Sequence, residues 1–251
     1  MGMRGEAAIV GFHELPATRR PTGAPEFILE QWARLAAAAI ADAGLSADQV
    51  DGLVTCGVME SQLFVPSTVA EYLGLAVNFA EIVDLGGASG AAMVWRAAAA
   101  IELGICQAVL CAIPANYLTP MSAQRPYDPG DALYFGASSF RYGSPQAEFE
   151  IPYGYLGQNG PYAQVAQMYA AAYGYDESAM AKIVVDQRVN ANHTPGAVFK
   201  DKPLTVADVL DSPIIASPLH MLEIVMPCMG GSAVLVTSAE LARKSRPRPV
   251  W

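Results

Sequence analysis

The sequence predicts an α/β fold with a mixed, mostly parallel five-stranded sheet and an inserted helical segment. Three observations predict it. Short apolar strand patterns alternate with helical patterns over the first 113 residues, which is the order of βαβ units. Proline, glycine and tyrosine replace that pattern from Pro114 onward, and one further strand and helix pattern follows near the C-terminus. With 251 residues, 53% of them hydrophobic and 16% charged, the chain is long and apolar enough to bury a full core.

The core elements follow in chain order. Strands are expected at 7–11, 52–56, 79–84, 107–113 and 232–237, and helices at 26–43, 67–73, 89–103 and 238–244. The helix at 89–103 begins at Ser89, which we expect to cap it, and ends at Gly104. This helix is apolar almost all round, so we expect it to lie buried between layers. The strand at 107–113 is apolar on both faces and must be covered on both sides.

The segment at 114–212 is predicted to be an insertion in a core formed by 1–113 and 213–251. Nine of the eleven tyrosines fall between Tyr127 and Tyr175, a concentration that packing against a parallel sheet does not require. Helical patterns occur at 161–173 and 177–192, and Thr205 with Asp208 forms a capping pair for a short helix. A long insertion with its own helices and aromatic residues usually serves a site, although a plain surface excursion is the alternative.

Composition excludes several classes of function. A net charge of −9 argues against nucleic acid as a partner, because phosphate binding needs a basic surface. No apolar run approaches the ~20 residues that span a bilayer, and no signal pattern opens the chain, so we expect no membrane partner and a cytoplasmic location. Four cysteines without Cys-x-x-Cys spacing and three scattered histidines predict no metal site.

The most informative stretch is the strand-to-helix turn at 84–93. Glycines at 86, 87 and 90 allow a sharp bend and a close approach of backbone to a ligand or a second helix. Such a turn directs backbone N–H groups and the positive end of a helix dipole at whatever lies on it. Tight strand-to-helix packing without a ligand is the alternative interpretation, and spacing alone does not decide between the two.

The motif Gly87-Ala88-Ser89-Gly90 resembles the nucleophile turn of the thiolase superfamily, whose sterol-carrier-protein-type and lipid-transfer branch has Cys-Ala-[Ser/Thr]-Gly at a helix start. Glycine therefore stands where the family has its nucleophilic cysteine. Other stretches are similar to family segments: 7–11, 45–53, 203–215 and 226–238, the last with Gly230 in place of the usual aspartate. The resemblance implies a thiolase-like layered fold, an αβα half carrying a helical loop domain.

The resemblance also implies the chemistry. Glycine forms no acyl-thioester, so thiolytic chemistry through a cysteine is not expected at this turn. Retro-aldol cleavage of a bulky β-hydroxyacyl-CoA, as in the lipid-transfer-type aldolases of steroid side-chain degradation, needs no covalent intermediate. Backbone N–H groups around Gly87, Ala88 and Ser89 are expected to polarise the thioester carbonyl. The substrate is a coenzyme A thioester, and no covalently bound cofactor is expected. The expected substrate-binding residues are Tyr117, Met121, Tyr134, His193, Met226, Cys228 and Gly231.

Alternatives remain open from the sequence. Ser89 as a nucleophile would need a neighbouring base that the sequence does not place beside it. A non-catalytic scaffold holding a small zinc-ribbon and OB-fold partner that binds acyl-CoA is a second function, and an acyltransferase of the acetyl-CoA acetyltransferase type is a third. The family implies a homodimer. It also places its acid and base residues in a second half, so we expect this chain to represent the first half and the loop domain.

Overall fold

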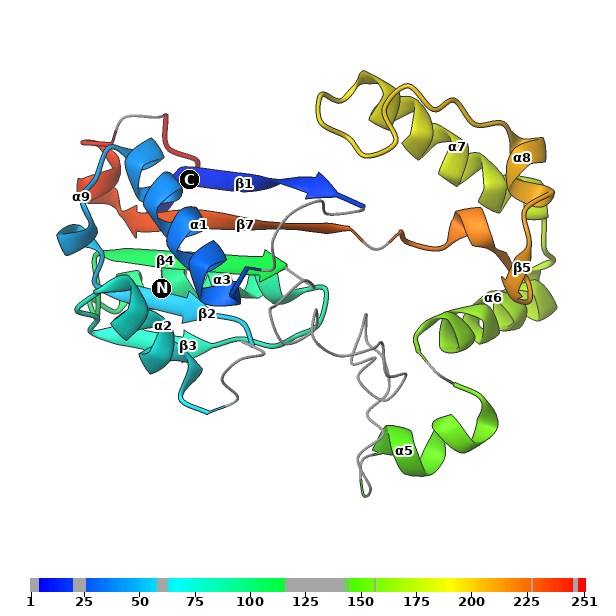
Figure 1. Cartoon of the computed structure of the whole chain (residues 1–251), viewed down its shortest axis with the longest axis horizontal. Coiled ribbons are helices and arrows are strands. Elements are labelled where there is room, and N and C mark those ends of the chain that lie inside the picture. The colour runs from blue at the N-terminus through cyan, green and yellow to red at the C-terminus, as the bar shows by residue number, and fades with distance from the viewer. Residues whose placement is uncertain are drawn as a thin grey trace. The chain divides into compact units, whose positions relative to one another are not determined.

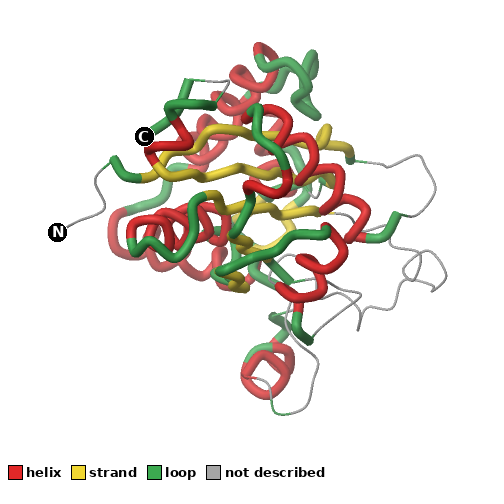
Figure 2. The backbone as a smooth tube through the Cα atoms, turned by 90° about the vertical axis from the view of Figure 1, so that its left-hand side faces the viewer, coloured by secondary structure: helices red, strands yellow, loops and turns green. Residues whose placement is uncertain are grey.

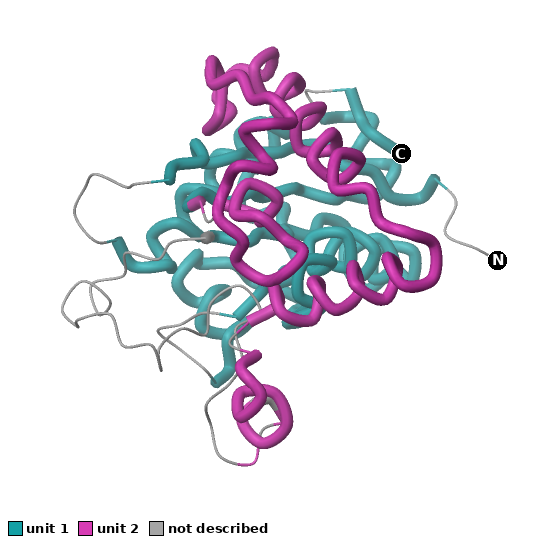
Figure 3. The backbone as a smooth tube through the Cα atoms, turned by 90° about the vertical axis from the view of Figure 1, so that its right-hand side faces the viewer, with its two compact units in different colours: residues 1–124, 229–251 teal, residues 125–228 magenta. Residues whose placement is uncertain are grey.

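The computed structural model describes residues 5–19, 26–57, 63–115, 143, 145–155, 157–226, 228–245 and 248–251. The chain divides into two compact units: unit 1 comprises 1–124 and 229–251, and unit 2 comprises 125–228 (Figure 3). Unit 2 ends later than the insertion expected at 114–212. The assignment of that insertion to a substrate pocket stays a prediction.

Unit 1 contains a five-stranded sheet in the order β1-β7-β4-β2-β3 (Figure 1). Its strands are β1 (Ala7–Thr18), β2 (Gly52–Thr55), β3 (Phe79–Ile82), β4 (Ala108–Ala115) and β7 (Met229–Ser238). β7 is antiparallel to both β1 and β4, whereas β2 is parallel to both β3 and β4. The expected mixed five-stranded α/β fold is confirmed.

Helices cover both faces of this sheet, as Figures 1 and 2 show. α1 (Ile28–Ala43) and α2 (Val65–Leu73) pack on one face, and α3 (Ser89–Glu102) packs on the other. The short helices η1 (Ala47–Gln49) and α9 (Ala239–Ala242) also belong to unit 1. The unit is therefore a three-layer α/β/α arrangement.

The two faces of strand β4 contribute to two different hydrophobic core clusters. Leu110 and Ala112 belong to the cluster under α1 and α2, and Val109 and Cys111 belong to the cluster under α3. All four side chains are at most 3% exposed. The prediction that this strand is apolar and covered on both faces is confirmed.

The helix α3 differs from its prediction. Met93 and Ala97 are fully buried against the sheet, but Trp95 is 54% exposed. One face of the helix is thus covered by unit 1 and the other is open among the described residues. An all-round apolar sequence shows that a helix can be buried, but not which neighbour buries each face.

Strand β1 also differs, because it continues to Thr18 instead of ending near Gly11. It pairs with β7 from Ala7 opposite Ser238 to Thr18 opposite Met229, with bulges on the way. In the second half of β1 only Leu15 is buried, and the extension of the strand is set by its pairing with a strand more than 200 residues further along the chain. At Gly11 this strand approaches α1 closely, since a Cβ there would lie 2.3 Å from the Ala39 carbonyl oxygen.

A carboxylate ties the two parallel strands β2 and β4 together at their beginnings. Oδ1 of Asp51 accepts hydrogen bonds from the N–H groups of Gln107, at 2.8 Å, and Ala108, at 2.9 Å. The Asp51 N–H donates to the Ala108 carbonyl oxygen at 3.1 Å. The start of β4 is therefore fixed relative to β2 by side chain and backbone together.

Unit 2 is mainly helical. It contains α5 (Pro145–Phe149), η3 (Ile151–Tyr153), α6 (Asn159–Tyr173), α7 (Glu177–His193), α8 (Val206–Leu210), β5 (Ile214–Ala216), β6 (Leu219–His220) and η4 (Met221–Glu223). The two longer predicted helices and the capping pair are confirmed: Thr205 Oγ1 accepts from the Asp208 N–H, and the Asp208 carboxylate accepts from the Thr205 N–H. Among the described residues, no helix has the length and hydropathy needed to cross a bilayer.

Candidate functional site

The turn between β3 and α3 is held together by the hydroxyl of Ser89. Ser89 Oγ accepts a hydrogen bond from the Leu85 N–H at 2.9 Å and donates one to the Gly86 carbonyl oxygen at 2.7 Å. Gly86 has a φ of +56°, the left-handed conformation that favours glycine. The N-cap position belongs to Ala88, and no side chain caps the helix. The expectation that Ser89 is the cap is therefore wrong: its hydroxyl reaches back to the turn instead.

This arrangement also weakens the case for Ser89 as a nucleophile. The side chain is 7% exposed, and its proton is directed at a carbonyl oxygen that cannot act as a base. A serine nucleophile needs a base within hydrogen-bond reach of its Oγ. The described contacts give Ser89 a structural role in shaping the turn.

Gly87 lies exposed on this turn. Among the described residues, no heavy atom lies within 4 Å of the position that a Cβ would occupy, and its φ is outside the left-handed range. Neither packing nor backbone conformation within the described chain requires glycine here. A side chain, including a cysteine, would fit at this position.

The backbone amides of the turn are not equally able to bind a substrate carbonyl. The Ala88 N–H donates to the Leu85 carbonyl oxygen at 3.2 Å, and the Ser89 N–H donates to that of Gly86 at 3.1 Å. Gly90 and Ala91 follow in the first turn of α3, where N–H groups have no intrahelical acceptor. Among the first residues of α3, the N–H groups that can bind a substrate oxygen are therefore those of Gly90 and Ala91, assisted by the helix dipole. Those of Ala88 and Ser89 already donate within the turn.

The turn lies at the edge of the sheet where the parallel strands β2, β3 and β4 end. A Cβ on Gly90 would be 3.7 Å from Ile113 Cδ1, near the end of β4. Ile113 pairs with Ser232, and the next residue, Pro114, pairs with Gly231. Gly231, one of the expected substrate-binding residues, is therefore at the same edge. Ligands of open α/β sheets bind at the carboxyl ends of the strands.

Three cysteines in unit 1 are poor nucleophiles. Burial raises the pKa of Cys56 to about 11, with a further contribution from the Asp84 carboxylate, and burial raises the pKa of Cys106 to about 11. Burial also raises the pKa of Cys111. Since the thiolate is the reactive form, these three thiols are not effective nucleophiles near neutral pH.

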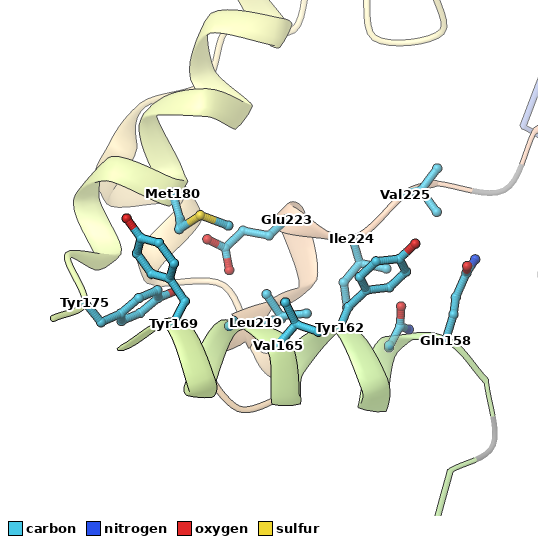
Figure 4. Close-up of a pocket in the computed structure, with 12 residues that line it drawn as sticks. Gln158, Tyr162, Val165, Tyr169, Tyr175, Met180, Leu219, Glu223, Ile224 and Val225 are labelled. Carbon is cyan, nitrogen blue, oxygen red and sulfur yellow. The ribbon is translucent and has the colours of Figure 1, made fainter. Parts of the chain in front are cut away.

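Unit 2 contains a cavity of ≈ 580 Å³ (Figure 4). Its lining is mostly apolar and aromatic, with two amides and one carboxylate: Gln158, Asn159, Tyr162, Val165, Ala166, Tyr169, Tyr175, Met180, Leu219, Glu223, Ile224 and Val225. The volume falls in the range of about 300–1,000 Å³ that small-molecule sites occupy.

The polar groups of this cavity are partly without partners. The Glu223 side chain is 3% exposed, and its Oε2 accepts from the His220 N–H at 2.6 Å and lies 3.2 Å from His220 Nδ1. Its Oε1 is buried and has no hydrogen-bond partner among the described residues, and the same holds for Tyr175 Oη. Burial, and then the Glu223 charge, raise the pKa of Tyr175.

None of the expected substrate-binding residues lines this cavity. His193 is exposed at the last position of α7, and Met226 and Cys228 are half-buried outside the lining. Tyr117, Met121 and Tyr134 lie outside the described residues. Sequence reasoning missed Glu223 and the lining tyrosines. The tyrosine concentration at 127–175 was the available signal, because Tyr162 and Tyr169 are seven residues apart and share one face of α6.

Comparison with protein-family models gives no match. A 17-hydroxy-3-oxo-4-pregnene-20-carboxyl-CoA lyase of Mycobacterium tuberculosis is 30% identical over 255 residues, covering 99% of this chain and 61% of that protein. A steroid side-chain-cleaving aldolase of Thermomonospora curvata is 30% identical over 246 residues, covering 95% of this chain and 58% of that protein. The chain thus spans about three fifths of the length of these relatives.

Solved structures of similar proteins have the same fold as this chain. An Ltp2-ChsH2(DUF35) aldolase superposes with a TM-score of 0.80 at 28% identity, covering 99% of this chain and 59% of that one. A monomeric SCP2-thiolase-like protein of Mycobacterium smegmatis shares the fold, with a TM-score of 0.66 at 21% identity over 96% of this chain and 47% of that one. In sequence and in fold, the chain is similar to members of the thiolase superfamily. The two relatives that are 30% identical to it over most of its length are named as a steroid-CoA lyase and a steroid side-chain-cleaving aldolase.

Proposed function

We propose that the protein carrying this sequence is an acyl-CoA lyase that cleaves a bulky β-hydroxyacyl-CoA by a retro-aldol reaction. The observation that carries this proposal is Gly87, which has no side chain at the position that the resemblance assigns to the nucleophile. The bend and the helix start of this turn support that assignment. The names of both relatives, a CoA lyase and an aldolase, support it.

The reaction needs two functions. A base takes the proton of the β-hydroxyl group, the bond between the α and β carbons breaks, and its electron pair forms the enolate of the shortened acyl-CoA. The β carbon leaves as a ketone or aldehyde, and the α carbon then takes up a proton. Negative charge develops on the thioester oxygen, where fixed N–H donors are most effective. The N–H groups of Gly87, Gly90 and Ala91 are the donors that we assign to this role, while the Ser89 hydroxyl holds the geometry of the turn.

The substrate class follows from the same comparison. The lyase of M. tuberculosis is named for a steroid 20-carboxyl-CoA, which supports a CoA thioester with a large apolar acyl group as the substrate here. The residues expected to contact it include Gly231, at the edge of the sheet that bears the turn. The reaction as written consumes no cofactor.

Partners belong to the same proposal. The solved aldolase is named as a pair of proteins, one marked DUF35, which supports our expectation of a small partner protein that binds acyl-CoA. A homodimer is expected from the family. The open face of α3, where Trp95 is 54% exposed, is consistent with association of unit 1 with further protein surface.

The test is to incubate the full-length protein and its partner with 17-hydroxy-3-oxo-4-pregnene-20-carboxyl-CoA and to identify the products by mass spectrometry. Cleavage between the hydroxyl-bearing carbon and the α carbon must give a 17-ketosteroid and propanoyl-CoA without added coenzyme A. A product that forms only when free coenzyme A is added, or an acyl adduct trapped on the protein, would contradict the proposal. A stable complex with the partner and no turnover would favour the scaffold function instead.

A further inference from the structure

The cavity of unit 2 contains a feature that its own fold does not explain. Oε1 of Glu223 is buried without a hydrogen-bond partner among the described residues, although an unpaired buried carboxylate oxygen is costly. The cavity is lined by this carboxylate, by the amides of Gln158 and Asn159, and otherwise by apolar and aromatic side chains. Figure 4 shows the Glu223 side chain extending from η4 toward Met180 of α7, above α6, which contributes five of the twelve lining residues.

Capping of η4 does not account for the burial. The cap needs one carboxylate oxygen, and Oε2 already fulfils that role by accepting from the His220 N–H. Another capping carboxylate of unit 2, on Asp208, caps α8 with the same geometry and is exposed to solvent. A carboxylate can thus cap in this unit without being buried, and the inward oxygen of Glu223 requires a separate explanation.

We propose that this cavity binds an apolar molecule through a neutral hydroxyl group, which donates its hydrogen bond to Oε1 of Glu223. A carboxylate is an acceptor only, so the ligand must supply a donor. An anionic group, such as a sulfate or carboxylate, is repelled by the Glu223 charge. The second unpartnered group, Tyr175 Oη, stays protonated because burial and the Glu223 charge raise the pKa of the phenol, and it can donate to the same ligand oxygen.

This inference goes beyond the proposed reaction, since it requires neither a CoA thioester nor catalysis. It is tested by binding alone, so its failure leaves the retro-aldol proposal standing and the reverse is also true. Rigid steroids are suitable probes because they are apolar and can differ in a single functional group. Androstan-3-ol, the matching 3-ketone and the matching 3-sulfate differ only at one end of the molecule.

The experiment measures binding of the three tritiated probes to the 251-residue chain by equilibrium dialysis. We expect the alcohol to bind at least about tenfold more tightly than the ketone, and the sulfate not to bind, because hydrogen bonds to a charged acceptor are the stronger ones. Equal affinity for alcohol and ketone, or preferred binding of the sulfate, would overturn the proposal.

The variant Glu223→Gln sharpens the test. The His220 N–H still needs an acceptor, so the amide oxygen must take the position of Oε2 and the NH₂ group that of Oε1. The inward acceptor then becomes a donor, and the preference should invert in favour of the ketone. An unchanged preference in a folded Glu223→Gln chain would contradict the assignment.

Three further variants complete the design. Asp208→Asn, which removes an exposed capping carboxylate of the same unit, should leave all three affinities unchanged. Val165→Trp should abolish binding of every probe by filling the cavity from a position that is 62% exposed and so tolerates a larger side chain. Should Glu223→Gln fail to fold, Tyr175→Phe serves as the second test, because it has no capping role. It should weaken binding of the alcohol roughly threefold to tenfold. An unchanged affinity would refute the proposal that Glu223 and Tyr175 together bind the ligand hydroxyl.

Discussion

Replacing Ser89 by alanine should loosen the turn that carries the candidate site. The change removes two hydrogen bonds, from the Leu85 N–H at 2.9 Å and to the Gly86 carbonyl oxygen at 2.7 Å. Each such bond contributes about 0.5–1.5 kcal/mol net, so the free energy of unfolding should fall by about 1–3 kcal/mol. With a denaturant slope of about 2 kcal/mol per M, the midpoint in urea should fall by roughly 0.5–1.5 M.

Tryptophan fluorescence suits this measurement, because Trp32, Trp95 and Trp251 all belong to unit 1, as the turn does. The control is Thr194→Ala in unit 2, which removes an exposed hydroxyl that donates to the Asn190 carbonyl oxygen at 2.8 Å. It should leave the unit 1 transition in place. If Ser89→Ala unfolds at the same urea concentration as the parent chain, the hydroxyl does not hold the turn, and the proposed positioning of the α3 amides loses its support.

Further predictions concern packing, ionisation and association. Gly11→Ala should destabilise unit 1 by about 1–3 kcal/mol or more, since its Cβ meets the Ala39 carbonyl oxygen at 2.3 Å. Gly57→Ala, whose Cβ would have no heavy atom of the described residues within 4 Å, should change stability by less than about 0.5 kcal/mol. The pKa of Cys56 is raised from 9.0 to about 11, so folding favours the neutral thiol. Its contribution to stability is present below pH 9 and is lost as the pH rises to 11. Cys56→Ala should therefore flatten the fall in the free energy of unfolding over that interval, by at most about 3 kcal/mol. The exposed apolar residues of unit 1, Trp95 and Leu103 among them, predict that the 251-residue chain self-associates or binds another chain; sedimentation as a single monomeric species would contradict this.

Local patterns predicted most of the sheet and its covering helices. The run at 107–113 became β4 with both faces buried, because an apolar strand without alternation has only one stable environment. The second half of β1 was not predicted, since its partner β7 lies far along the chain. Pairing with a strand so distant in sequence does not require an alternating pattern of apolar and polar residues in the strand itself.

For the candidate sites too, local patterns predicted some features, and others depend on contacts between segments that are distant in sequence. The glycines marked the turn correctly, yet the Ser89 hydroxyl can reach either a cap position or the preceding turn, and only the folded backbone decides between them. The cavity of unit 2 could not be located from sequence, because its lining joins α6, α7 and η4, which are separated by as many as about 60 residues. A tyrosine-rich segment indicated a site without indicating which carboxylate would face it.

The hydrogen bonds of Asp51 have a consequence for how the sheet assembles. No tight loop sets the alignment of neighbouring parallel strands, so a slip by one residue would turn every apolar side chain of β4 to the opposite layer. The Asp51 carboxylate, by holding two successive amides at the entrance to β4, allows one alignment and penalises its neighbours. A single acidic side chain thus fixes the pairing register of the central strand β4. That register decides which β4 side chains enter each of the two hydrophobic core clusters.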